Sequence, residues 1–186
     1  MRLTSGPLGR GYAATATTIA KMHELVRLGV LGQHSLMLKG IVDQAIRHLP
    51  RRDYRAEAEA LLQYVQRNVR YTRDAATADG VEVLQHPFVT LVQRSAGDCD
   101  DLSVALATLY ALAGFQYAFR TVGCGEDPLD FQHVYVVVYV PQYGWLAADP
   151  SYEEPLGWEP SRCGETVMRD GSTVARVTTS KDWEPQ

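Results

Sequence analysis

The run Ser95-Ala-Gly-Asp-Cys-Asp-Asp-Leu102 constrains the fold more than any other stretch, because it places a cysteine where a glycine turn meets a helix. Residues 102–113 are rich in alanine and leucine and predict that helix. Asp98 is a good N-cap, and Asp101 can answer it in a capping-box-like arrangement. Cys99 would then hold the first helical position, where free backbone N–H groups and the helix dipole stabilise a thiolate nucleophile.

Two strand-like stretches downstream offer a base and an orienting carboxylate. Residues 131–140 are rich in β-branched and aromatic side chains, and His133 stands at the entrance of this predicted strand. A second stretch, residues 144–151, follows a turn, so the two predict a hairpin. Asp149 closes the second strand. Paired strands can place a histidine and a carboxylate side by side, as a Cys-His-Asp triad requires.

These motifs together resemble the transglutaminase-like superfamily of papain-fold cysteine enzymes, in particular its small bacterial or phage-type members. The resemblance implies that Cys99 is the nucleophile, His133 the base and Asp149 the orienting group. The family's usual Asp-Pro-Thr is Asp-Pro-Ser here. The residues that carry the resemblance are Gly97-Asp-Cys-Asp-Asp, His133-Val-Tyr-Val and Trp145-Leu-Ala-Ala-Asp-Pro-Ser, with weaker similarity over 58–71 and 85–91.

The expected fold class is α+β, with N-terminal helices packed on an antiparallel sheet and the nucleophile at a helix N-terminus. We expect a flexible segment at 1–15 and a single transglutaminase-like domain at 16–186, whose core covers about 40–155 and whose strand and tail extension covers 156–186. The predicted helices are 17–28, 35–48 and 55–69, besides the nucleophile helix. The predicted strands are 116–122, 132–140 and 145–148, with a final hairpin formed by 166–169 and 173–178.

The resemblance implies cysteine-dependent acyl transfer on amide bonds of a protein or peptide substrate through a thioester. Hydrolysis is favoured, and transamidation that crosslinks proteins stays open. The oxyanion would bind the Cys99 backbone N–H and one upstream donor, for which Gln85 and Gln93 are weak candidates. The alternative is a non-catalytic structural or assembly protein, such as a virion-associated one, that keeps the fold.

Composition excludes several other classes of function. The net charge of −4 gives no basic field for nucleic acid, and no apolar stretch is long enough to span a membrane. The absence of a signal peptide favours the cytoplasm, or a virion if the protein is phage-encoded. In such a reducing compartment Cys124 and Cys163 are expected to be free thiols.

No metal and no cofactor are expected. The carboxylates of Asp98, Asp100 and Asp101 suggest a cation site only superficially, because side chains one or two positions apart on a helix diverge. A zinc site formed by Cys99, His133 and Asp149 is the minority alternative, since each residue type is a legitimate ligand.

Overall fold

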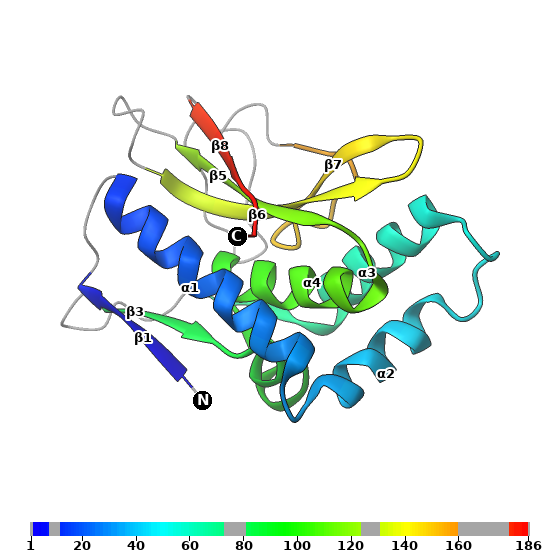
Figure 1. The fold of residues 1–186 in the computed structure, drawn as a ribbon, viewed down its shortest axis with the longest axis horizontal. Helices are drawn as coiled ribbons and strands as arrows, with labels where there is room; N and C mark the ends of the chain where they lie inside the picture. The colour runs from blue at the N-terminus through cyan, green and yellow to red at the C-terminus, as the bar shows by residue number, and fades with distance from the viewer. Residues whose placement is uncertain (1, 8–11, 73–80, 124–130, 160–178, 186) are drawn as a thin grey trace.

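The computed structural model describes residues 2–7, 12–72, 81–123, 131–159 and 179–185, with the backbone alone for 2–7 and for 81–82. The four α-helices in these residues all precede the main antiparallel sheet along the chain and cover one face of it, as Figure 1 shows. This arrangement confirms the predicted α+β class. Within the described residues, no helix has the length and hydropathy needed to cross a membrane. The helices are α1 (Tyr12–Leu31), α2 (Ser35–Ile46), α3 (Tyr54–Asn68) and α4 (Cys99–Ala113).

Helix α4 is the centre of the hydrophobic core, and α1, α2, α3 and the sheet pack around it (Figure 1). Its residues from Leu102 to Tyr110 are all buried. The sequence of α4 is apolar on almost every side. Such a helix is stable only when other parts of the protein enclose it. Its C-cap is Gly114, whose φ of 88° lies in the left-handed region that glycine adopts without strain.

The main sheet has the strand order β7-β6-β5-β8, and all its pairs are antiparallel. The β6–β7 hairpin and the preceding strand β5 agree with the prediction to within one or two residues. Alternating side chains of β6 face the helices, and the others face a smaller buried cluster on the opposite side of the sheet. The strands are β5 (Tyr117–Gly123), β6 (Phe131–Val140), β7 (Gly144–Ala148) and β8 (Thr179–Trp183).

The structure corrects the prediction near both ends of the chain. Residues 2–7, which we expected to be flexible, form β1 (Arg2–Pro7) and pair with β3 (Val81–Gln85), while α1 already begins at Tyr12. Strand β8 was not predicted. The hairpin predicted at 166–178 lies outside the described residues.

Between α3 and α4 the chain is more regular than the connector that we expected. Strand β2 (Arg70–Tyr71) pairs in parallel with β4 (Ala96–Gly97), and the π-helical segment η1 (Val89–Arg94) lies between them in sequence. These short elements bring the chain back beside α3 immediately before α4 begins. The start of α4 is therefore anchored by backbone hydrogen bonds on its upstream side.

Candidate active site

Helix α4 begins at Cys99, as predicted, and a glycine makes this start possible. A Cβ atom at Gly97 would lie 2.5 Å from the Cβ atom of Asp101 and 2.8 Å from its Oδ2, closer than any side chain tolerates. Asp98 occupies the N-cap position, and its carbonyl oxygen accepts the first helical hydrogen bond, from the N–H of Leu102, at 3.0 Å. The thiol of Cys99, which is half-buried, thus stands on the first turn of a helix.

The predicted capping box is wrong. The Asp98 side chain makes no capping hydrogen bond, although its residue holds the N-cap position. Asp101 does not reach back to Asp98, because its carboxylate accepts hydrogen bonds from the backbone N–H of Gln85 at 2.7 Å and from the Gln85 side-chain amide. Asp100 caps instead, since its Oδ1 accepts from the N–H of Asp101 at 2.9 Å. The contact between Gln85 of strand β3 and Asp101 therefore replaces the predicted capping box.

Three side chains from distant parts of the chain meet at this helix start. His133, near the beginning of β6, places its Nε2 atom 2.7 Å from Oδ2 of Asp149, one residue beyond the end of β7. The ring of His133 also hydrogen-bonds the side chain of Cys99. Because Nε2 is engaged by the carboxylate, Nδ1 is the ring nitrogen left for the sulfur. The structure thus brings together all three residues of the predicted triad.

The imidazole and the carboxylate are buried, with 5% of His133 and 3% of Asp149 exposed. Burial alone lowers the pKa of His133, but the charge of Asp149, its hydrogen bond and the Cys99 side chain outweigh that effect and raise the pKa to about 10. His133 is therefore a cation at neutral pH. An imidazolium beside a cysteine side chain can favour the thiolate form of that cysteine.

Asp149 is held by its own backbone and by a buried glutamine. Its Oδ1 accepts the N–H of Ser151 at 3.0 Å, which leaves Oδ2 for His133. The Gln66 amide nitrogen, on α3, donates to the carbonyl oxygens of Tyr152 and Glu154 at 2.7 and 2.9 Å. Gln66 was not among the predicted site residues. A signal existed, because this polar residue occupies a position of α3 that helical periodicity assigns to the core.

The acidic residues at the helix start gather, contrary to the expectation that they diverge. One carboxylate oxygen from each of Asp98, Asp100 and Asp101 lies within 4.8 Å of the others. Asp98 is outside the helical backbone conformation, with φ −94° and ψ −162°, so helical spacing does not separate its side chain from the other two.

A proton on one carboxyl explains this cluster better than a cation. Burial raises the pKa of Asp100 well above its ordinary value, and the charge of Asp98, a hydrogen bond between the two carboxyls and the nearby Cys99 and Asp101 add to the rise. A hydrogen bond between two carboxyl groups requires a proton on one of them. Asp101 is already engaged by Gln85. We therefore place the proton on Asp100, whose pKa is raised, and Asp98 accepts the hydrogen bond.

The contacts do not favour Gln85 as the second oxyanion donor. Its side-chain nitrogen donates to Asp101 and lies 3.4 Å from the carbonyl oxygen of Ala96, so Gln85 ties β3 to the start of α4. Gln93 is exposed on η1. The backbone N–H of Cys99, at the first position of α4, stays the expected donor. Cys124 and Cys163 lie outside the described residues.

Comparison with known proteins shows the family of the chain and a similar fold. The model of the Transglutaminase-like superfamily matches residues 42–150, which is more than half of the chain. No curated protein matches the chain. A proposed protease from Parabacteroides distasonis has a similar fold, with a TM-score of 0.56 and 13% identity over 87% of this chain and 31% of that one.

A proposed cysteine protease from Cytophaga hutchinsonii gives a TM-score of 0.47 and 16% identity, over 81% of this chain and 47% of that one. The periplasmic domain of TgpA from Pseudomonas aeruginosa, bound to ethylmercury, gives 0.49 and 23%, over 66% and 46%. The chain thus spans less than half the length of each of these structures. The residues that the family model matches, 42–150, make up more than half of the chain. The chain belongs to the transglutaminase-like superfamily.

Proposed function

We propose that this protein catalyses cysteine-dependent acyl transfer on amide bonds, with hydrolysis of a protein or peptide as its main reaction. Members of the superfamily generally have cysteine peptidase or transglutaminase activity. The observation that supports the proposal most is the buried imidazole of His133, which lies 2.7 Å from Asp149 and hydrogen-bonds the thiol at the start of α4. That geometry supplies a nucleophile, an acid and an orienting group.

In the first step the Cys99 sulfur forms a bond to the carbonyl carbon of the scissile amide. The C–N bond then breaks, and the proton of the His133 imidazolium passes to the leaving nitrogen, so that an amine departs and a thioester remains. The Cys99 backbone N–H stabilises the oxyanion. Asp149 holds the ring so that Nδ1 faces the sulfur throughout.

In the second step water attacks the thioester, and neutral His133 accepts its proton. The C–S bond breaks, a carboxylic acid leaves, and the thiolate and imidazolium are restored. If a substrate amine attacks instead of water, the same steps give an amide and a crosslink. Hydrolysis and transamidation therefore share the thioester that Cys99 forms.

The proposal is tested by incubating the protein with casein and with an added primary amine. Release of peptides reports hydrolysis, and incorporation of the amine reports transamidation. We expect Cys99→Ala to remove both activities with little loss of stability, and His133→Ala to remove them as completely, because the members of a triad act as a unit. Asp149→Ala should leave a small residual rate, since its role is orientation.

Thiol labelling gives a second readout that needs no substrate. Iodoacetamide should modify Cys99 faster than Cys124 and Cys163 near neutral pH, because the thiolate is the reactive form. Labelling of Cys99 that is no faster than that of the other two, together with no turnover of any amide, would instead support a structural or assembly role. Activity that survives Cys99→Ala and disappears on chelation would support a metal site.

A further inference from the structure

A row of side chains crosses the sheet next to the candidate site. The strand register places Asp182 of β8 opposite Arg120 of β5, and Arg120 opposite Tyr135 of β6. His133 lies two residues before Tyr135 on the same strand, so both side chains project from the same face of the sheet. The row thus runs from Asp182 on β8 to Tyr135, which lies beside His133 on β6.

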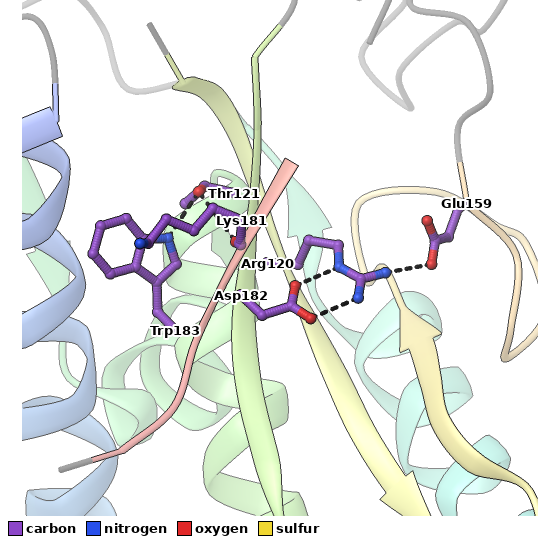
Figure 2. Close-up of polar contacts among 6 residues, drawn as sticks. All are labelled: Arg120, Thr121, Glu159, Lys181, Asp182 and Trp183. Carbon is purple, nitrogen blue, oxygen red and sulfur yellow. Dashed lines mark hydrogen bonds and ion pairs between the residues drawn. The ribbon is translucent and has the colours of Figure 1, made fainter. Parts of the chain in front are cut away.

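Arg120 is the centre of this row and is held from two sides. Its Nε and Nη2 atoms donate to the two carboxylate oxygens of Asp182 at 2.5 and 2.7 Å, and Nη1 donates to Glu159 at 2.5 Å (Figure 2). These partners lie 62 and 39 residues away along the chain. Because the guanidinium binds a carboxylate on each of two sides, its plane is fixed. A lysine ammonium has no plane to fix and could not bind both carboxylates in this way.

Strand β8 is also fastened from its other face. The indole nitrogen of Trp183 donates to the hydroxyl of Thr121 at 2.8 Å, as Figure 2 shows. The strand that carries Asp182 is therefore itself held against β5. A flexible loop would not give the same fixed position.

The position of Arg120 is transmitted to the imidazole through a buried tyrosine. Arg120 donates a hydrogen bond to the hydroxyl of Tyr135, of which only 1% is exposed. The ring centroid of Tyr135 lies 5.8 Å from that of His133, and Tyr152 lies 5.9 Å away at nearly a right angle. The imidazole therefore lies against two aromatic rings, and one of them is tied to Arg120.

We infer that Arg120 and Tyr135 are positioning residues of the Cys99–His133–Asp149 group, and that strand β8 completes this group by fixing Arg120. The inference rests on the proposed function. Tyr135 lies against the ring that must keep Nε2 on Asp149 and Nδ1 on the sulfur. A rotation of that ring would lengthen both contacts together. A side chain that restricts the rotation therefore keeps the reactive geometry and supports the rate of acyl transfer.

The decisive measurement is the titration of His133, followed by NMR of its ring C–H groups in Arg120→Gln. Removing a positive charge by itself raises the pKa of a nearby histidine. The positioning role predicts the opposite sign, because a displaced ring loses its contacts with Asp149 and Cys99. We expect the midpoint to fall by roughly one unit or more from its high starting value.

Tyr135→Phe tests the same link without any change in charge and with little risk to folding. We expect a fall in the same direction, and the double variant should lose no more than Arg120→Gln alone, because the two residues act in series. The rate of Cys99 alkylation near neutral pH should fall about tenfold in both single variants. Lys39→Gln is the matched control, since it removes an exposed ion pair with Asp43 at 2.5 Å, and it should change neither readout.

The two readouts separate the inference from the proposed function. An unchanged or higher His133 midpoint in both Arg120→Gln and Tyr135→Phe overturns the positioning role, whatever the alkylation rates are. Slow alkylation of Cys99 in the unaltered protein counts against the proposed function instead. If Arg120→Gln does not fold, the titration of Tyr135→Phe decides by itself.

Discussion

Replacing Asp149 by asparagine should remove a stabilising charge pair whose contribution depends on pH. The substitution keeps the shape of the side chain and takes away its charge, so the His133 ring stays buried without its counter-ion. Burial then lowers the pKa of His133, and the ring is neutral at pH 7. The free energy of unfolding of the variant should therefore be lower, by the amount that binding of the proton to His133 contributes to the stability of the fold.

The pKa shift gives the size of this loss. A rise of the His133 pKa from 6.5 in the unfolded chain to about 10 in the fold corresponds to roughly 5 kcal/mol, at about 1.4 kcal/mol for each unit. This agrees with the 3–5 kcal/mol or so that removing one partner of a buried ion pair typically costs. We therefore expect Asp149→Asn to lose on the order of 4 kcal/mol at neutral pH.

The sign of the pH dependence follows from the raised pKa. The contribution of His133 to stability is fully present below the unfolded pKa of 6.5 and is lost as the pH rises through about 10. The assay is urea unfolding of the protein and of Asp149→Asn at several pH values between about 6 and about 10. The difference in free energy of unfolding between the two should shrink steadily across that range.

Asp43→Asn is the control, because it removes the same charge from an exposed side chain paired with Lys39. Exposed ion pairs contribute about 0–1 kcal/mol, so this variant should differ little from the unaltered protein. The reasoning is refuted if Asp149→Asn costs the same free energy at each pH, because the buried ring would then carry no proton in the fold.

Three further substitutions test the surroundings of the site, and a fourth, Gly40→Ala, is a control for one of them. Asp100→Asn should fold and keep Cys99 reactive, because an amide can donate to Asp98 as the protonated carboxyl does; a thermal melt and an alkylation assay near pH 8 check this. Gly97→Ala should destabilise by about 1–3 kcal/mol in urea unfolding, since its Cβ would press on Asp101, whereas Gly40→Ala, with no atom within 4 Å, should stabilise by about 0.5–1 kcal/mol. Gln66→Leu should lower turnover more than Cys99 alkylation, because it frees the loop that carries the orienting carboxylate.

The start and end of α4 could be predicted because their signals are local. The glycine turn before Cys99, the alanine- and leucine-rich segment after it and the left-handed Gly114 all lie within one short stretch. Strands β5, β6 and β7 also follow from runs of β-branched and aromatic residues. The meeting of Cys99, His133 and Asp149 followed from the family resemblance, since no spacing along the chain encodes it.

The features that the sequence analysis missed depend on partners far away in the chain. Strand β8 is five residues long and has alternating intermediate and exposed positions, so it carries no strong hydrophobic pattern. Its pairing is fixed by Asp182 on Arg120, across 62 residues. The capping box failed for the same reason, because Gln85 engages Asp101 from another element, which a local rule does not consider.

Two protons reduce the negative charge around Cys99. A thiolate at Cys99 would stand at a helix start where the carboxyl groups of Asp98, Asp100 and Asp101 gather, and Asp100 interacts electrostatically with the Cys99 side chain. Were all three ionised, their repulsion would oppose the thiolate, which the dipole of one helix would offset by only about 1 kcal/mol. A proton on Asp100, whose pKa is raised well above its ordinary value, removes one of these negative charges.

The second proton lies on the imidazole of His133, which adds a positive charge in contact with the Cys99 side chain. Burial and the charge of Asp98 keep the proton on Asp100, whereas the charge of Asp149 keeps the proton on His133 against the effect of burial. Loss of either proton as the pH rises would make the surroundings of the Cys99 sulfur one charge more negative. The thiolate itself persists at high pH, but the proposed acid step needs the imidazolium, so amide turnover should fall as the pH rises through about 10. Asp100→Asn, which cannot lose the first proton, should keep that alkaline limit.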